Sequence, residues 1–331
     1  MIVQTLTRRR LIGALTVVAC GTVPAIAVAD YPDRPIRIVV PFTPGGGTDA
    51  AARIFAEKMA LELGQTVIVE NKPGAASIIG ANMVAKAKGD GYTLLFAASN
   101  AFITNQFFYT DVPYETKRDF KLLYQVATIP QVLVVNSDVK VKTAPELLEY
   151  VKEHKGKINY GSYGIGSYPH LAGSYMSAKQ DADMIHIAYK GEAPILQAML
   201  GKDIHFTFAS AMGVTPHVQA GTMNALGITG KTRISALPDL PTLVEQGLTD
   251  DAYSVSGWLG FAAPASTPDD ISARIAATLL KVAQMPEVQK RFEEMGFLMI
   301  TDSNPEKVTA VYERDLPIWT ALVESSGAKV D

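Results

Sequence analysis

The sequence predicts an α/β fold in which two similar units follow one another along the chain. Short apolar strands alternate with helical patterns from Ile36 to Phe96, and the same alternation restarts after Val132–Val135. Each unit also places a glycine-rich turn between a strand and a helix, at 45–47 in the first and at 161–167 in the second. Because short apolar strands separated by helices favour parallel pairing, we expect a mostly parallel sheet flanked by helices in each unit.

The composition is that of a globular protein with a sizeable core. The chain has 331 residues, of which 48% are hydrophobic and 19% are charged, which is enough for two ordinary domains. Its formal net charge is −3, and no basic run follows the N-terminus. This charge distribution gives no footprint for nucleic acid or for an anionic membrane surface, so an anionic ligand must be bound locally.

The first residues have the pattern of an export signal. Arg8-Arg9-Arg10 precedes an apolar run from Leu11 to Ala19, and Ala27-Val28-Ala29 satisfies the small-x-small rule for cleavage. The apolar run is shorter than the roughly 20 residues that span a membrane. We therefore expect residues 1–29 to be a signal peptide, with cleavage after Ala29 and a mature chain in the periplasm.

Two alternatives for export stay open. The arginines at 8–10 also fit a twin-arginine signal, which exports folded proteins, as well as general secretion. Cys20 is the only cysteine, and it could be the lipidated residue of a lipoprotein with residues 21–30 as a tether. Cleavage after Ala29 would instead leave a mature chain without any disulfide.

The first unit reads as strand, helix, strand, helix, strand. The strands are expected at Ile36–Val40, Thr66–Val69 and Tyr92–Phe96, and the helices from the glycines to Leu63 and from Ala75 to Lys88. Ligands of parallel sheets bind at the carboxyl ends of the strands, so residues 42–49 should share one rim with Ser99 and Asn100. The aromatic segment 102–119 is expected to be irregular and to pack beside this rim.

The second unit repeats the alternation. After strands at Leu122–Val126 and Val132–Val135, further strands are expected at Ile158–Tyr160, Met184–Ala188, Ile204–Ala209 and Met223–Ile228. Helices are expected at Pro145–His154, Tyr168–Lys179, Ala193–Leu200 and Thr215–Ala220.

The C-terminal part contains one strand and three helices. The strand is expected at Gly257–Ala262, and the helices at Asp269–Gln284, Glu287–Met295 and Glu306–Val323. Helices without a sheet of their own should pack back onto the first sheet. We therefore predict a discontinuous lobe 1 made of residues 30–128 and 254–331, and a lobe 2 made of residues 129–253.

The two glycine-rich turns are the main candidates for a binding site. A helix N-terminus offers unpaired N–H donors and a partial positive charge, so two such ends facing a cleft would suit carboxylates. Either turn alone could be only a tight connection. Neither ends in the Gly-Lys-Ser/Thr of a phosphate-binding loop, and 45–47 lacks the spacing of a dinucleotide fingerprint.

Two charged residues lie next to these turns, and each has two interpretations. Asp49 falls in the first turn of the first helix, where it could cap N–H groups or contact a ligand. Lys190 is the only cation near a strand end of the second unit. It could pair with Glu192, remain solvated, or bind the ligand.

Catalytic motifs are missing from the mature sequence. It has no G-x-S-x-G elbow, no H-E-x-x-H and no cysteine nucleophile. Ser167 and His170 could form a nucleophilic pair, which leaves a secreted hydrolase as a minor alternative. The other histidines are not spaced as metal ligands, so we expect no metal. Because catalytic motifs are missing as well, we expect a protein that is not an enzyme and has no cofactor.

Six segments, in the same order, are similar to those of one family. They are Val40–Asp49 with Ala52-Arg53, Val69–Ala75, Gly91–Leu95, Tyr160–Ser167 with His170-Leu171, Tyr189–Gly191, and Pro238–Thr242. Over essentially the whole mature chain, the sequence resembles the substrate-binding proteins of tripartite tricarboxylate transporters, the Bug family of periplasmic solute receptors. It departs from the common pattern at Lys72, usually arginine, and at Ala76-Ser77, usually glycines.

The resemblance implies a two-lobed periplasmic binding protein of type II, whose lobes close like a flytrap about two hinge strands. Its ligand carboxylate would be held by main-chain amides and bridging waters. Carried over, lobe 1 contributes Phe42, Thr43, Pro44, Gly45, Gly46 and Asp49, and lobe 2 contributes Ser162, Gly164, Gly166, Ser167, His170, Ala209 and Ser210. Ser99 and Asn100 are predicted because they follow a strand at the same rim, and Lys190 is predicted both by its place near a strand end and by the resemblance. Tyr163 and Tyr168 are included as variable positions of the second turn.

The resemblance also implies a function. A monomeric receptor would capture a small organic carboxylate, which could be a di- or tricarboxylate, an aromatic acid or an acidic amino acid, and deliver it to the membrane subunits of a transporter. A receptor with the same pocket could feed a sensor kinase instead. The sequence does not name the acid.

Overall fold

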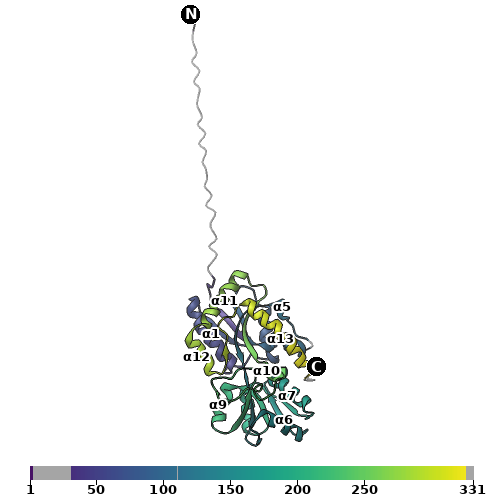
Figure 1. Cartoon of the computed structure of the whole chain (residues 1–331). Helices are drawn as coiled ribbons and strands as arrows, with labels where there is room; N and C mark the ends of the chain where they lie inside the picture. Colours follow the sequence, from purple (N-terminus) through teal and green to yellow (C-terminus); the bar gives the residue numbers. More distant parts are fainter. Residues whose placement is uncertain (3–30, 110, 326–331) are drawn as a thin grey trace. The chain divides into compact units, whose positions relative to one another are not determined.

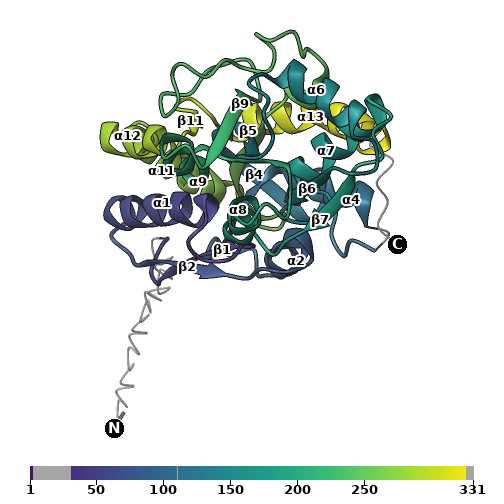
Figure 2. The same ribbon diagram turned by 90° about the horizontal axis from the view of Figure 1, so that it is seen from below.

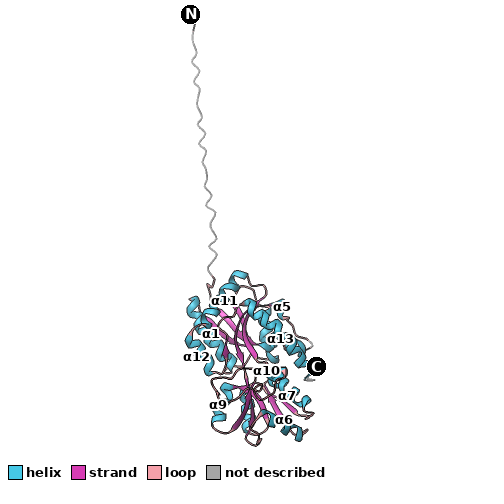
Figure 3. Ribbon diagram, viewed as in Figure 1, coloured by secondary structure: helices cyan, strands magenta, loops and turns pink. Residues whose placement is uncertain are grey.

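The computed structural model describes residues 1–2, 31–109 and 111–325. The expected signal peptide, its cleavage site and Cys20 lie outside the described residues. From Tyr31 onward the chain forms one compact unit. This unit contains two separate sheets, one of six strands and one of five (Figures 1 and 3).

The six-stranded sheet combines the first strands of the chain with strands from its end. Its members are β1 (Ile36–Val40), β2 (Val67–Asn71), β3 (Thr93–Ala98), β4 (Phe120–Ile129), β10 (Gly257–Pro264) and β11 (Leu298–Met299). Their order is β11-β4-β10-β3-β1-β2. β1 runs parallel to both β2 and β3, whereas β10 runs antiparallel to β3 and β4.

Helices cover both faces of this sheet. They are α1 (Gly47–Leu63), α2 (Ile78–Ala85), α11 (Asp269–Ala283), α12 (Pro286–Glu294) and α13 (Pro305–Ser325). α1, α11 and α12 lie together (Figures 1 and 2) and share a core with one face of the sheet. α2 and α13 contribute to the core on the other face. The C-terminal helices thus pack on the sheet formed by the first strands.

The five-stranded sheet repeats the same arrangement. It contains β5 (Gln131–Asn136), β6 (Asn159–Ser162), β7 (Ile185–Ala188), β8 (Phe206–Ser210) and β9 (Met223–Ile228), in the order β7-β6-β8-β5-β9. β6 is parallel to β7 and β8, and β5 is antiparallel to β8 and β9. Its helices are α6 (Ala144–Glu153), α7 (Tyr168–Lys179), α8 (Glu192–Leu200) and α9 (Ala211–Gln219).

The chain passes between the two sheets twice. It leaves the first sheet after β4 and enters the second at β5, and it returns from β9 to β10. The chain enters β5 and β10 from the other sheet. Because no helical crossover joins them to a neighbouring strand of their own sheet, they can run antiparallel to that neighbour. The expected parallel pairing is therefore limited to β1–β3 and β6–β8, and both sheets are mixed where mostly parallel sheets were expected. Ile129 still pairs with Gly257 in the first sheet, and the predicted lobe boundaries stay a prediction.

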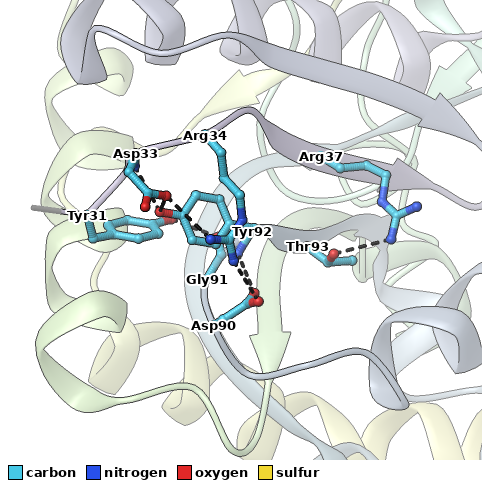
Figure 4. Close-up of polar contacts among 8 residues, drawn as sticks. All are labelled: Tyr31, Asp33, Arg34, Arg37, Asp90, Gly91, Tyr92 and Thr93. Atoms are coloured by element: carbon cyan, nitrogen blue, oxygen red, sulfur yellow. Dashed lines mark hydrogen bonds and ion pairs between the residues drawn. The ribbon is translucent and has the colours of Figure 1, made fainter. Parts of the chain in front are cut away.

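Figure 4 shows how the first described residues of the compact unit are attached to β3. The Tyr31 hydroxyl donates to the Gly91 carbonyl at 2.7 Å, and the Tyr92 hydroxyl donates to Asp33 Oδ1 at 2.6 Å. The Arg34 guanidinium lies 3.7 Å from the centre of the Tyr92 ring and pairs with Asp90. This cluster sits before β3 begins, at the edge opposite the carboxyl ends of β1 and β3.

Several elements differ from the sequence-based expectation. α9 starts at Ala211, not Thr215, because the Ser210 hydroxyl accepts the Gly213 N–H at 3.1 Å and caps the helix there. The helix expected at Ala75–Lys88 is split into a 3₁₀ turn, η1 (Ala75–Ser77), and α2. Four short helices were not expected as such: α3 (Ser99–Phe102), α4 (Asn105–Phe108), α5 (Thr116–Asp119) and α10 (Asp251–Ser254).

Candidate functional site

A cavity of about 600 Å³ lies between the two sheets. Its lining comes from the segments that follow β1, β2, β3, β6 and β7, together with residues of β5 and β8, Phe297 before β11 and Trp319 of α13. The carboxyl ends of the parallel strands of both sheets thus meet at one site, as expected for α/β sheets. Both glycine-rich turns contribute to the lining of this cavity.

Most of the predicted site residues line this cavity. They are Phe42, Thr43, Gly46, Ser99, Asn100, Tyr163, Gly164, Gly166, Ser167, Tyr168, Lys190 and Ser210. The remaining predicted residues are not part of the lining, and they are Pro44, Gly45, Asp49, Ser162, His170 and Ala209. Among these, Asp49, Ser162 and His170 support the two turns from behind.

α1 opens directly on the cavity. Its N-cap, Gly46, is extended and no side chain caps the helix. The N–H groups of Gly46, Gly47 and Thr48 find no acceptor among the described residues. These donors and the positive end of the helix dipole are therefore free for an anion.

Asp49 is turned away from the cavity and braces this turn. Its buried carboxylate accepts hydrogen bonds from Gly45 N–H at 2.9 Å, Asn71 Nδ2 at 2.9 Å and Arg53 Nε at 3.0 Å. Burial by itself would raise the pKa of Asp49, but the hydrogen bonds from Arg53, Gly45 and Asn71 hold it below its ordinary value. Of its two interpretations, the geometry supports the structural one.

α7 opens on the other side of the cavity, and several of its amides are already used. Gly164 N–H donates to Ser162 Oγ at 3.2 Å, and Gly166 N–H donates to His170 Nδ1 at 3.2 Å. No side chain caps α7, and the N–H groups of Ile165 and Tyr168 find no acceptor among the described residues. The free donors of this turn are therefore not those of its glycines.

A pair of histidines lies behind the second turn. The rings of His170 and His186 are 4.2 Å apart, and His186 Nε2 is 2.6 Å from Ser162 Oγ. The pKa of both histidines is lowered to about 4, by burial in the case of His186, and by burial together with the nearby His186 in the case of His170. Ser167 Oγ donates to the Gly164 carbonyl at 2.6 Å and not to His170. The Ser–His bond that the hydrolase alternative needs is not formed.

A third helix start at the cavity escaped the sequence analysis. α8 follows Gly191 without a side-chain cap, and Gly191 and Glu192 N–H have no acceptor in the described chain. A Cβ on Gly191 would lie 3.6 Å from Thr43 Oγ1, so this loop approaches the first glycine turn. The signal was present: Gly191 stands between a strand and a helix, as in the other two turns.

Lys190 and Glu192 do not pair with each other. Lys190 is exposed, lines the cavity and makes no ion pair with another described residue. The Glu192 carboxylate instead accepts the Ser210 N–H at 2.6 Å and the Ser210 hydroxyl at 2.9 Å. The two charges at this end of the cavity are therefore separate.

The turn at η1 lines the cavity in a strained conformation. Three consecutive residues other than glycine have left-handed backbone angles, with φ of 44° at Ala75, 47° at Ala76 and 84° at Ser77. The side-chain amides of Asn100 and Asn105 both donate to the Ala76 carbonyl and to Ser77 Oγ. These are the positions where the sequence departs from the family's glycines.

Other lining residues gave no local signal in the sequence. Among them are Thr104, Gln131, Phe297 and Trp319. Phe297 and Trp319 come from the C-terminal helical region, far along the chain from the first turn. Only the packing of that region against the first sheet brings them to the cavity.

Two α/β halves that enclose one cavity, with helix N-termini around it, define a two-lobed solute-binding protein. The family model described as "tripartite tricarboxylate transporter family receptor" matches residues 51–327. The chain therefore belongs to this family, as the resemblance of its motifs had indicated.

Relatives and solved structures agree with this assignment. The chain is 33% identical over 317 residues to a protein encoded in the tcbD-tcbE intergenic region of Pseudomonas sp. (strain P51), covering 96% of this chain and 93% of that protein. It is 34% identical to the periplasmic binding protein BugD, with a TM-score of 0.82 and coverage of 90% and 99%. These likenesses support the Bug family and the α/β two-lobed fold.

Two similar structures hold carboxylates. Rpa4515 of R. palustris with adipate has a TM-score of 0.84 at 27% identity, covering 91% of this chain and 100% of that chain. MatC (Rpa3494) from Rhodopseudomonas palustris with bound malate has a TM-score of 0.80 at 26% identity, covering 88% and 100%.

The described residues contain neither a candidate membrane span nor a metal-ligand cluster. None of the described helices is both long and apolar enough to cross a membrane. No group of three or more His, Cys, Asp or Glu side chains in residues 31–109 and 111–325 is placed to hold a metal ion.

Proposed function

We propose that this protein is a periplasmic receptor that captures a small organic carboxylate between its two halves and delivers it to a tripartite tricarboxylate-type transporter. The observation that carries the proposal is the convergence of three uncapped helix starts, those of α1, α7 and α8, on one cavity. Each start offers free N–H donors to an anion.

The magnitudes are sufficient for binding. Each helix end stabilises a negative charge by about 0.3–1 kcal/mol when exposed, and by up to about 2 kcal/mol when partly buried. Hydrogen bonds to a charged group add roughly 1.5–3 kcal/mol each. The cavity volume of about 600 Å³ lies within the usual range for small-molecule sites, roughly 300–1,000 Å³.

The adipate and malate in two similar structures support a carboxylate as the ligand class. The family description supports the transporter as the partner. Nothing in the comparisons supports the sensor-kinase alternative, and we do not propose it.

A thermal-shift titration of the purified chain tests the capture step. The panel contains adipate, malate, citrate, benzoate, glutamate and aspartate. A ligand at a hundred times its Kd should stabilise the fold by about 2.7 kcal/mol, and the shift should grow with concentration. If no acid in the panel moves the melting temperature, the proposal is wrong.

The delivery step needs a separate test. Cells that contain the membrane subunits of a tripartite tricarboxylate-type transporter should take up the identified ligand only when this protein is also present. Uptake at the same rate without the protein would refute delivery while leaving capture intact.

A further inference from the structure

The polar groups that line the cavity fall into two sets: free hydrogen-bond donors, and groups whose donors are already bonded within the chain. The starts of α1, α7 and α8 present N–H donors without acceptors in the described chain. A different part of the lining, made of Gln131, Tyr163, Glu192 and Ser210, has its donors already used. We call these four residues the acceptor wall.

The side-chain hydrogen-bond donors of the acceptor wall already have acceptors within the described chain. The Tyr163 hydroxyl donates to Gln131 Oε1 at 3.2 Å, and Gln131 Nε2 donates to the carbonyls of Ile129 and Pro130. Ser210 donates its N–H and its hydroxyl to the two oxygens of Glu192. What remains are mainly lone pairs, on the Glu192 carboxylate above all, so the wall favours a ligand that brings a donor.

Glu192 has no cation beside it. No Lys, Arg or His of residues 31–109 and 111–325 forms an ion pair with its carboxylate, and both of its hydrogen bonds come from Ser210. Burial raises the pKa of the Glu192 carboxyl above its ordinary value, and the same carboxyl helps to raise the pKa of Tyr163. A partly buried carboxylate that lines a cavity without a counter-charge is costly, unless a ligand supplies the charge.

We infer that Glu192 is a specificity-determining residue, and that it selects a carboxylate which also carries a protonated amine. The carboxylate of such a ligand binds at the helix starts, and its ammonium group binds at the acceptor wall. This inference rests on the proposed function and narrows its ligand class from organic acids in general to amino-carboxylates.

Simple dicarboxylates fit this arrangement poorly. A second carboxylate placed about 4 Å from Glu192 would cost about 4 kcal/mol at an effective dielectric constant of about 20. Lys190 also lines the cavity but is exposed, so water and salt screen its charge. Water and salt therefore screen the partly buried carboxylate of Glu192 less than the exposed charge of Lys190.

Matched pairs of ligands test the inference by calorimetric titration. Each pair has one carbon skeleton with and without the amine: L-glutamate and glutarate, L-phenylalanine and 3-phenylpropanoate, and 6-aminohexanoate and hexanoate. In at least one pair the amine should bind about tenfold more tightly or better, because a site that pairs with an N–H group rejects the analogue without it. If the partners without the amine bind as tightly in every pair, the inference is wrong and the proposed function stands. If no compound of the pairs or of the acid panel binds, both fail.

The variant Glu192→Gln shows whether Glu192 causes the discrimination. It keeps an acceptor for Ser210 N–H and removes the charge, so the preference for the amine should fall by about tenfold. Binding of the monocarboxylate partners without the amine, 3-phenylpropanoate and hexanoate, should change by less than about threefold. Equal losses for both members would mean that Glu192 only braces Ser210, and would overturn the inference.

A control comes from another helix of the same half. Glu146 lies in the first turn of α6 and accepts the Lys142 N–H at 2.7 Å, outside the cavity. Glu146→Gln should leave the preference for the amine unchanged. If Glu192→Gln does not fold, the ratio measured with the unmodified protein still decides the question.

Discussion

Gly46 stands where α1 meets the cavity, and its surroundings leave it no structural need to be glycine. Its backbone is extended, with φ of −82°, and a Cβ placed on it would have its nearest neighbour, the Thr43 carbonyl oxygen, 4.0 Å away. Gly47, by contrast, is in contact with Phe297, whose ring atom would lie 2.8 Å from a Cβ. The two glycines therefore separate binding from folding.

We expect Gly46→Val to abolish ligand-induced stabilisation while the free protein keeps its melting temperature within a few degrees. The branched side chain would occupy the space in front of the free N–H groups of α1 without straining the backbone. Thermal-shift titration with the tightest ligand of the panel measures this. Leu61→Val, at the exposed end of the same helix, is the control. Normal binding by Gly46→Val would place the carboxylate elsewhere.

The histidine pair makes stability depend on pH in a definite direction. His170 and His186 have pKa values of about 4 in the folded protein, below the ordinary 6.5. Between pH 4 and pH 6.5 the unfolded chain therefore binds more protons than the folded protein. The contribution of the two histidines to the free energy of unfolding is fully present above pH 6.5 and is lost as the pH falls towards 4. We expect a slope of up to about 1.4 kcal/mol per pH unit for each histidine.

Urea unfolding at pH 7, 5.5 and 4 would measure this slope, and His186→Gln should reduce it. His217→Gln removes a histidine of α9 outside the pair and should leave the slope unchanged. An equal slope in His186→Gln and the unmodified protein would show that the pair is not the source.

At the scale of elements, local chemistry determined most of what the sequence could predict. α7 has the predicted bounds, Tyr168–Lys179, because Pro169 in its first turn and a glycine-rich turn before it mark its start. α9 was placed too late because its cap is Ser210, the last residue of β8. A serine that is both strand and cap leaves no gap for a sequence pattern to show.

The η1 turn is the element most out of keeping with its own residues. Left-handed backbone angles cost a residue other than glycine roughly 1–2 kcal/mol. Glycine avoids this cost, but it loses more conformational entropy on folding, which offsets part of the benefit. We therefore expect Ala76→Gly to raise the free energy of unfolding by about 0.5–1 kcal/mol, measured by urea titration.

A second glycine substitution provides the contrast. Ala85→Gly replaces the last residue of α2, where the backbone is helical, and should lower stability by up to about 1 kcal/mol. If Ala76→Gly destabilises the protein as much as Ala85→Gly does, the turn stores no strain.

At the scale of the whole compact unit, side chains of one half hold the cavity turns of the other. The Thr104 hydroxyl donates to the Gly166 carbonyl at 3.1 Å, and the Tyr168 ring packs edge-on against Trp319, 6.1 Å away. The Phe108 ring would lie 3.0 Å from a Cβ on Gly166. The shape of the second turn therefore depends on contacts from the first half, and we expect these contacts to hold the halves closed around a ligand.

Thr104→Val should weaken binding of every ligand alike, by about fivefold, because one hydrogen bond between the halves contributes about 1 kcal/mol. Calorimetric titration measures the loss. Thr320→Val, which removes a hydroxyl bonded within α13, serves as the control. A loss confined to one ligand would show that Thr104 contacts that ligand and does not secure closure.

The sequence by itself determined the α/β class, the family and the two glycine-rich turns, because strand–helix alternation and glycine at a tight turn are local properties of the chain. Only the tertiary structure decided which amides are free, since Ser162 and His170 occupy those of Gly164 and Gly166. It also brought the start of α8 and Glu192 to the cavity. Hydrogen-bond pairing and burial depend on neighbours distant in sequence, and no local pattern encodes them.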